Sequence, residues 1–83
     1  MTVKYYVIVD DGYPAERPAG MVRRVQDGEG YHDEALEKDL EWRGTGALVE
    51  WEFGNSPSKF VQIGEDLVPG IIEQFRERWS ELR

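Results

Sequence analysis

The chain has 83 residues, with 10 basic and 17 acidic side chains, a net charge of −7 and no cysteine. This length indicates one domain, residues 1–83, with a small core, and the lack of cysteine excludes disulfides and thiolate metal sites. The negative charge disfavours ligands that carry phosphates, so we expect neither nucleic acid nor an anionic membrane as a partner.

The N-terminal run MTVKYYVIVDD ends in two aspartates and is too short for the apolar region of a secretory signal. Apolar runs elsewhere in the sequence also stay well below the roughly 20 residues that cross a bilayer. We therefore expect a soluble, cytoplasmic protein.

The first predicted strand is Val3 to Asp10 (VKYYVIVD), the run richest in β-branched and aromatic residues. Both of its faces are apolar, which is typical of a central strand. Gly12, Pro14 and Pro18 then indicate a connection. Gly20 to Gln26 (GMVRRVQ) is the next predicted strand, and we expect it to pair antiparallel with the first.

Arg23 and Arg24 form the one basic pair that lies within a predicted strand. Neighbouring side chains of a strand point to opposite faces, so the two guanidinium groups cannot grip one anion together. This geometry favours cross-strand pairing with acidic residues. The alternative is that one of the two arginines binds an anionic ligand.

The stretch Tyr31 to Trp42 fits two structures. At a period of two, Leu36, Leu40 and Trp42 face inward and the acidic residues face outward, with Lys38 as an exception. At a helical period, the two leucines stack on one face. Residue propensity favours the helix, but the tryptophan fits the strand better, and we favour the strand.

The stretch Thr45 to Phe53 is also open between strand and helix. Its apolar residues alternate with polar ones, as in a half-buried strand: Ala47, Val49, Trp51 and Phe53. Against the strand, Thr45 is a suitable N-cap and Gly54 a suitable C′ residue for a helix of two turns.

The last predicted elements are a short strand, Phe60 to Ile63, and a helix, Asp66 to Leu82. Asp66 is the candidate cap of this helix, and Pro69 lies near its start. The apolar residues of the helix form one stripe: Val68, Ile71, Ile72, Phe75, Trp79 and Leu82. The predicted fold class is α+β, a small antiparallel sheet of three or four strands packed against a C-terminal α-helix.

Four segments recur together in a set order: YYVIVD, PAGMVRR, DEALEKDLEW followed by Thr45, and VQI before a helix that ends in RERW. With them, most of the chain resembles a family of small uncharacterised actinobacterial proteins. The resemblance implies a short helix and then a strand after Thr45, and it implies no activity. Gly44 and Gly46 flank Thr45 where the family pattern has proline and aspartate, which weakens the helical interpretation.

The sequence contains no arrangement typical of an enzyme or a metal site. His32 is the only histidine, and no serine lies in a nucleophile-elbow context. The segment from Asp27 is spaced like a calcium loop, but His32 stands where glycine is needed and Lys38 where a bidentate carboxylate is needed. We predict no catalytic residue, metal or cofactor.

Two functions remain open. The first is a non-enzymatic protein–protein interaction module, in which Glu37, Asp39 and Glu41 form an acidic row on a strand and meet a basic surface of another protein. Its apolar anchor would be Trp42 or Trp51, which flank a glycine-rich connection. The second is a small-ligand or anion-binding domain that uses Arg23 or Arg24.

Overall fold

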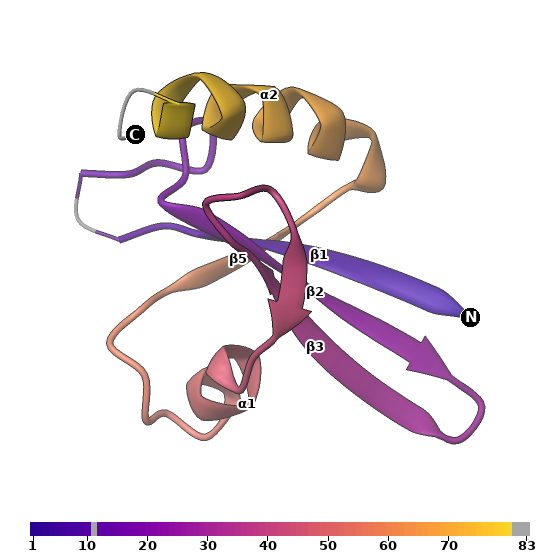
Figure 1. The fold of residues 1–83 in the computed structure, drawn as a ribbon. Coiled ribbons are helices and arrows are strands. Elements are labelled where there is room, and N and C mark those ends of the chain that lie inside the picture. The colour runs from indigo at the N-terminus through magenta and orange to yellow at the C-terminus, as the bar shows by residue number, and fades with distance from the viewer. Residues whose placement is uncertain (11, 81–83) are drawn as a thin grey trace.

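A computed structural model describes residues 1–10 and 12–80 of the chain. It contains a five-stranded antiparallel sheet with helices on both faces (Figure 1). The strand order is β4-β3-β2-β1-β5. In chain order the elements are β1 (Thr2–Ile8), β2 (Gly20–Asp27), β3 (Gly30–Leu36), β4 (Trp42–Gly44), α1 (Ala47–Glu52), β5 (Phe60–Ile63), a 3₁₀ turn η1 (Glu65–Leu67) and α2 (Val68–Ser80).

The predicted α+β class, an antiparallel sheet packed against a C-terminal helix, is confirmed, with five strands where three or four were predicted. β1 lies between β2 and β5, as its two apolar faces predicted. β1 and β2 pair antiparallel, so that Val7 lies opposite Met21.

The sheet carries one hydrophobic cluster on each face. α2 covers the larger one, whose buried members are Val7, Met21, Leu36, Val68, Ile71 and Phe75. α1 covers the smaller one, formed by Val22, Leu48 and Phe60. Met21 and Val22 are neighbours in β2 and each is 1 % exposed, yet they belong to different clusters because successive side chains of a strand alternate.

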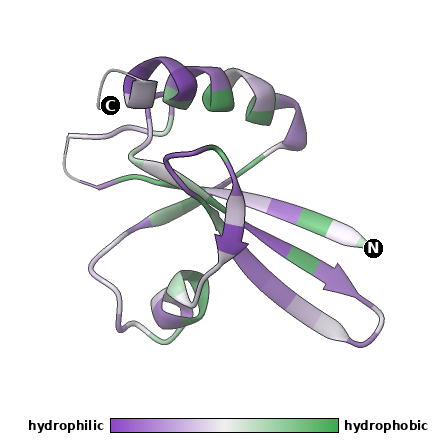
Figure 2. Cartoon of the chain, viewed as in Figure 1, coloured by the Kyte–Doolittle hydropathy of each residue, from purple (hydrophilic) through white to green (hydrophobic). Residues whose placement is uncertain are grey.

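The predicted stripe of the C-terminal helix faces the sheet, and Figure 2 shows the hydrophobic residues of α2 on that side. Val68, Ile71 and Phe75 are buried, Ile72 and Trp79 pack against them, and Leu82 lies outside the described residues. α2 begins two residues later than predicted, since Asp66 belongs to the 3₁₀ turn that precedes it.

The prediction of one strand from Tyr31 to Trp42 is correct only for its first half. β3 ends at Leu36, and a tight connection leads into β4 at Trp42. Within the connection, the Glu41 amide donates to the Asp39 carboxylate (3.0 Å) and Leu40 has a φ of 65°. An aspartate that bonds the backbone two residues ahead competes with the β ladder, which explains why the strand stops.

The helical interpretation of Thr45 to Phe53 is confirmed over Ala47–Glu52. The predicted N-cap, Thr45, is wrong: Gly46 is the N-cap, and the Thr45 hydroxyl, one residue earlier, accepts a hydrogen bond from the Ala47 amide (3.2 Å). Gly54 has a φ of +76°. A residue in the left-handed region ends the helix there, as the glycine predicted. α1 thereby places Leu48 against the second face of the sheet.

The central position of Phe75, which is 0 % exposed, gives a test of the docking of α2. We expect Phe75→Ala to lower the free energy of unfolding by about 3–5 kcal/mol, because it removes a buried ring and leaves a cavity. The measurement is urea denaturation followed by tryptophan fluorescence.

The matched control is Phe53→Ala, since Phe53 is 76 % exposed. This variant should change the free energy of unfolding by no more than about 0.5 kcal/mol. Equal losses in the two variants would contradict the packing of α2 on the sheet.

Candidate functional site

The predicted acidic row does not lie on a strand. Glu37, Asp39 and Glu41 are exposed residues of the connection between β3 and β4, so they do not share one strand face, and that prediction is wrong. Lys38 and Arg43 lie in or beside the same connection and offset two of the three acidic charges. The connection is therefore only weakly acidic.

Asp39 is paired within this connection. Its carboxylate accepts hydrogen bonds of 2.8 and 2.6 Å from the Arg43 guanidinium. The bonds from Arg43 lower the pKa of Asp39 from 3.8 to about 2. Both side chains are about half exposed, so the pair fixes the local shape of the connection more than it stabilises the fold.

Trp42 and Trp51, the predicted anchors, lie on opposite faces of the sheet. Trp42 packs at the edge of the cluster under α2, where its ring lies 6.2 Å from that of Tyr5 and the Arg23 guanidinium lies 4.3 Å from its centroid. Trp51 lies on α1, 5.3 Å from the Phe60 ring. Both are partly buried, so the five predicted site residues do not form one surface.

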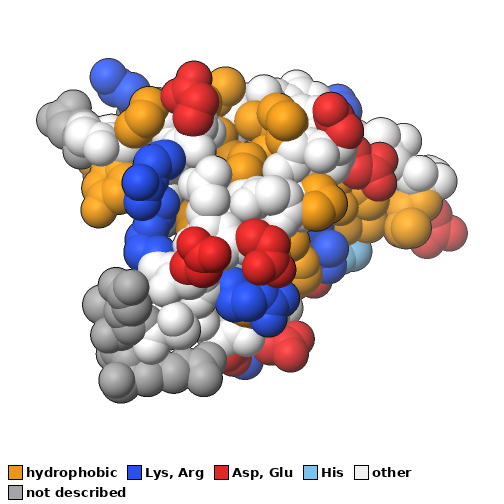
Figure 3. Space-filling model, turned by 90° about the horizontal axis from the view of Figure 1, so that it is seen from above, with side chains coloured by type: hydrophobic (Ala, Val, Ile, Leu, Met, Phe, Trp, Pro, Cys, Tyr) orange, Lys and Arg blue, Asp and Glu red, His pale blue; other side chains and the backbone are white. Residues whose placement is uncertain are grey.

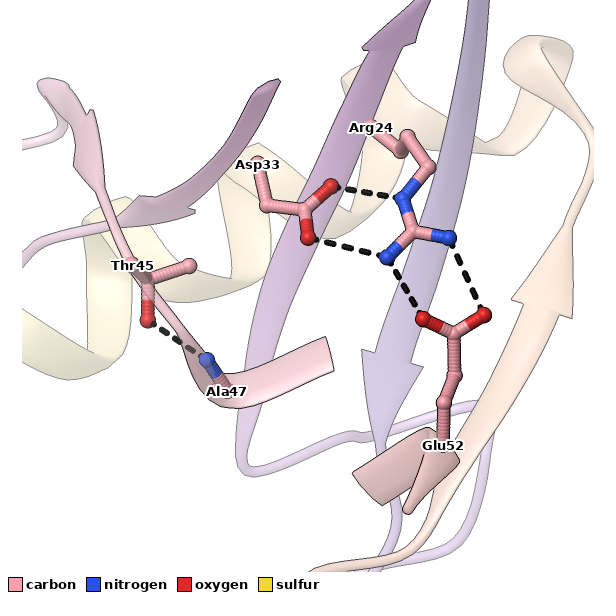
Figure 4. A network of polar contacts seen from close by, with 5 residues as sticks. All are labelled: Arg24, Asp33, Thr45, Ala47 and Glu52. Carbon is pink, nitrogen blue, oxygen red and sulfur yellow. Dashed lines mark hydrogen bonds and ion pairs between the residues drawn. The ribbon is translucent and has the colours of Figure 1, made fainter. Parts of the chain in front are cut away.

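Arg23 and Arg24 pair across strands, as the alternation of strand side chains predicted. Arg23 bonds to Glu34 at 2.7 Å. Figure 4 shows the Arg24 guanidinium between two carboxylates, Asp33 at 2.7 and 3.0 Å and Glu52 at 2.7 and 3.0 Å. An anionic ligand could use either arginine only by displacing these partners.

The Arg24 network holds α1 on the sheet. Asp33 is 7 % exposed, and the Arg24 side chain is 11 % exposed. Bonds to Arg24 lower the pKa of Glu52, and bonds to Asp33 and Glu52 raise the pKa of Arg24. The network therefore connects β2, β3 and the end of α1 through one side chain.

An open apolar hollow lies elsewhere, beside β5. Its volume is about 400 Å³, and its walls come from the β1–β2 connection, the end of β5, the 3₁₀ turn and the first half of α2: Ala15, Glu16, Ile63, Leu67, Gly70, Ile71 and Gln74. We call this hollow the β5 groove. Gly70 leaves it open, because a Cβ there would meet no atom within 4 Å.

Exposed apolar and acidic residues belong to the segments that line the β5 groove. Leu67 is 54 % exposed, and Val61, next to the groove on β5, is 41 % exposed. Glu16, Glu65 and Asp66 are exposed and form no ion pair within residues 1–10 and 12–80. Toward the right of Figure 3, where α2 begins, hydrophobic and acidic side chains lie next to one another.

Gln74 forms the wall between the β5 groove and a second hollow. Its Nε2 donates to the Glu16 carbonyl (2.9 Å), which ties the β1–β2 connection to α2. Its buried Oε1 has no partner among the described residues. The second hollow, about 390 Å³, is lined by Arg17, Glu77 and Arg78 as well, so both signs of charge line it.

No pattern in the sequence predicts the β5 groove. Its one signal was Leu67, an apolar residue that follows two acidic ones and does not belong to the α2 stripe. A large apolar side chain outside the core pattern is a candidate for contact with a partner. Ala15 and Ile63 line the groove because of tertiary packing, which the sequence pattern does not predict.

Comparison with protein-family models, with curated proteins and with solved structures finds no match to this chain. The resemblance to a family of small actinobacterial proteins therefore remains an expectation. None of the described helices is long and apolar enough to cross a membrane. No group of three metal-ligating side chains is found within residues 1–10 and 12–80.

The burial of Asp33 beside Arg24 gives a second test. We expect Arg24→Leu to lower the free energy of unfolding by about 3–5 kcal/mol, because it leaves a buried carboxylate without its partner. The double variant Arg24→Leu/Asp33→Leu should recover part of this loss. Urea denaturation measures both, and a double variant less stable than the single one would contradict the pairing.

The depressed pKa of Asp39 predicts a pH dependence. A carboxyl group with a folded pKa below its unfolded value contributes stability that is complete above the unfolded pKa, 3.8, and is lost as pH falls through about 2. In Arg43→Gln, the Asp39 titration should move up toward 3.8. NMR titration of the side-chain carboxyl carbon measures it, and an unchanged midpoint would contradict the pair.

Proposed function

We propose that this protein is a non-enzymatic, cytoplasmic interaction module that binds another protein through the β5 groove. The observation that carries the proposal is an apolar hollow lined by an exposed leucine, Leu67, and by Glu16, with two further exposed acidic residues, Glu65 and Asp66, directly before Leu67 in the chain. Interfaces commonly combine an apolar centre with a polar rim. The partner that fits this surface presents apolar side chains next to lysine or arginine.

Charge supports a basic partner at this place. Glu16 lines the groove, and Glu65 and Asp66 belong to the 3₁₀ turn that contributes Leu67 to it; none of the three has an ion-pair partner among the described residues. Repulsion among neighbouring carboxylates costs stability that interspersed lysines would avoid. A basic partner relieves this repulsion when it binds. Such electrostatic attraction acts mainly on the association rate and weakens with salt, because the screening length is about 8 Å at physiological ionic strength.

The β5 groove fits this function better than the surface around Trp42. In the β3–β4 connection, Asp39 is already paired with Arg43, and Lys38 offsets a further acidic charge. Trp42 is itself covered by Arg23 and Tyr5. Leu67, in contrast, has more than half of its surface exposed beside a hollow.

The test is affinity capture from the native host with three immobilised baits. The first bait is the unchanged protein, the second carries Glu16→Lys and Glu65→Lys at the groove, and the third carries Glu37→Lys and Glu41→Lys at the β3–β4 connection. Both double variants change the net charge by the same amount. We expect the groove variant to lose at least about tenfold of a partner that the other two baits retain.

Circular dichroism of the three baits controls for folding. A partner retained equally by all three baits would show that the groove is not the binding surface. A partner lost only from the third bait would move the site to the β3–β4 connection. Equal loss of the partner from both double variants would show that the acidic residues attract it only non-specifically.

A further inference from the structure

β5 is an end strand whose outer edge has no strand beside it among the described residues. The Val9 amide donates to the Lys59 carbonyl (2.8 Å), in the same register that pairs Val7 with Val61. Bonding alternates along an antiparallel ladder, so Val61 and Ile63 bond toward β1, whereas Phe60 and Gln62 direct their amide and carbonyl groups outward. Two residues of β5 therefore offer backbone hydrogen bonds to a further strand.

The four residues of this edge strand lack the side chains that commonly block strand addition, although the strand is short and exposed Lys59 comes directly before it. Edge strands are often protected by charged side chains or proline, and β5 (FVQI) has neither between Phe60 and Ile63. The other end strand, β4, has only three residues and includes Arg43, which is paired with Asp39. The free edge that borders an apolar hollow is the β5 edge.

The β5 groove lies where alternate side chains of an added strand would point. Val61 and Ile63 share the sheet face that α2 covers, because they lie opposite Val7 and Tyr5. A sixth strand would lie about 4.8 Å beyond β5, and every second side chain would face the same side. Those side chains would meet Val61, Leu67 and the hollow behind them.

We propose that β5 accepts an extended segment of the partner as a sixth strand, with two apolar side chains in the β5 groove and lysine or arginine at the end of the segment that lies beside Glu65 and Asp66. The proposal deepens the proposed function, since it assumes that the groove binds a protein. Backbone bonds to Phe60 and Gln62 supply part of the affinity, and the groove selects the apolar side chains.

Charge distinguishes this occupant from a second copy of the chain. Two copies paired through β5 would bring two acidic rims together, each with Glu16, Glu65 and Asp66. Like charges placed opposite each other oppose association. A basic segment is attracted at the Ile63 end of β5, where Glu65 and Asp66 follow the strand, whereas exposed Lys59 precedes its other end.

The probe is a synthetic nine-residue peptide, acetylated and amidated, with the order Lys-Lys-Thr-Leu-Thr-Leu-Thr-Lys-Lys. We expect it to shift the amide signals of Phe60, Gln62 and Leu67 in NMR spectra, and to slow hydrogen exchange of the Phe60 and Gln62 amides. Leu67→Lys should weaken binding at least about tenfold. The matched control Phe53→Lys, at another exposed apolar residue, should leave binding unchanged.

Two N-methylated peptides test the strand directly. One is methylated on the threonine amides and the other on the leucine amides. In a β ladder only alternate amides of the added strand face β5, so one peptide should lose binding and the other should retain it. Equal binding of both would overturn strand addition. If Leu67→Lys still weakened that binding, the groove and the proposed function would stand.

Two further outcomes would overturn the inference. The first is the absence of any shift at about 1 mM peptide, a concentration that detects weak binding. The second is a dimer in sedimentation velocity that Leu67→Lys dissociates, which would assign the edge to a second copy of the chain. The proposed function has its own test: it is contradicted if the bait with Glu16→Lys and Glu65→Lys keeps its partner in the capture experiment, whatever the peptide results are.

Discussion

Two neighbouring residues of β2 impose the constraint on which the rest of the structure depends. Met21 and Val22 are both almost fully buried, and they point to opposite faces of the sheet. A chain of 83 residues must therefore cover the sheet twice, with α2 on one face and α1 on the other. α1 has six residues, which is too short for a stable isolated helix, so burial of Leu48 and the bonds between Glu52 and Arg24 must hold it.

Coverage of both faces leaves the sheet edges open. The helices lie over the faces, and the end strands β4 and β5 have three and four residues. Short end strands limit uncontrolled pairing between copies, which is one way in which proteins protect their edges. At β5 the 3₁₀ turn brings Leu67 and the start of α2 next to the open edge, and this neighbourhood creates the groove.

The sequence predicted those parts of the fold whose signals were local. The two apolar faces of β1, the opposite directions of Arg23 and Arg24, and the apolar stripe of α2 each follow from one periodicity, and the structure confirms them. The Tyr31 to Trp42 stretch was mispredicted in its second half because Asp39 starts a turn inside a pattern that also alternates. Lys38, the one residue that does not fit the alternation, lies in this turn next to Asp39.

The candidate surface was harder to predict than the fold. Side chains of the β5 groove come from two separate stretches, residues 15–16 and residues 63–74, so no spacing along the chain brings the first to the second. For α1, the pattern favoured neither state. The structure confirms Gly54 as the residue after its C-terminal end, whereas the N-cap is Gly46 and not the predicted Thr45. Tertiary contacts between distant segments cannot be inferred from periodicity alone.

The positions of the acidic residues, more than the net charge of −7, decide which partner the β5 groove can attract. Several carboxylates of the sheet and helices already have arginine partners: Asp33, Glu34, Asp39, Glu52 and Glu73. The screening length in physiological salt is about 8 Å, so a partner responds to the charges nearest its contact surface. Because Glu16 lines an apolar hollow and Glu65 and Asp66 directly precede Leu67 in its wall, their charge acts near a place where side chains can also be buried. The same number of acidic residues in the β3–β4 connection is offset by Lys38 and Arg43 and so lacks this local excess.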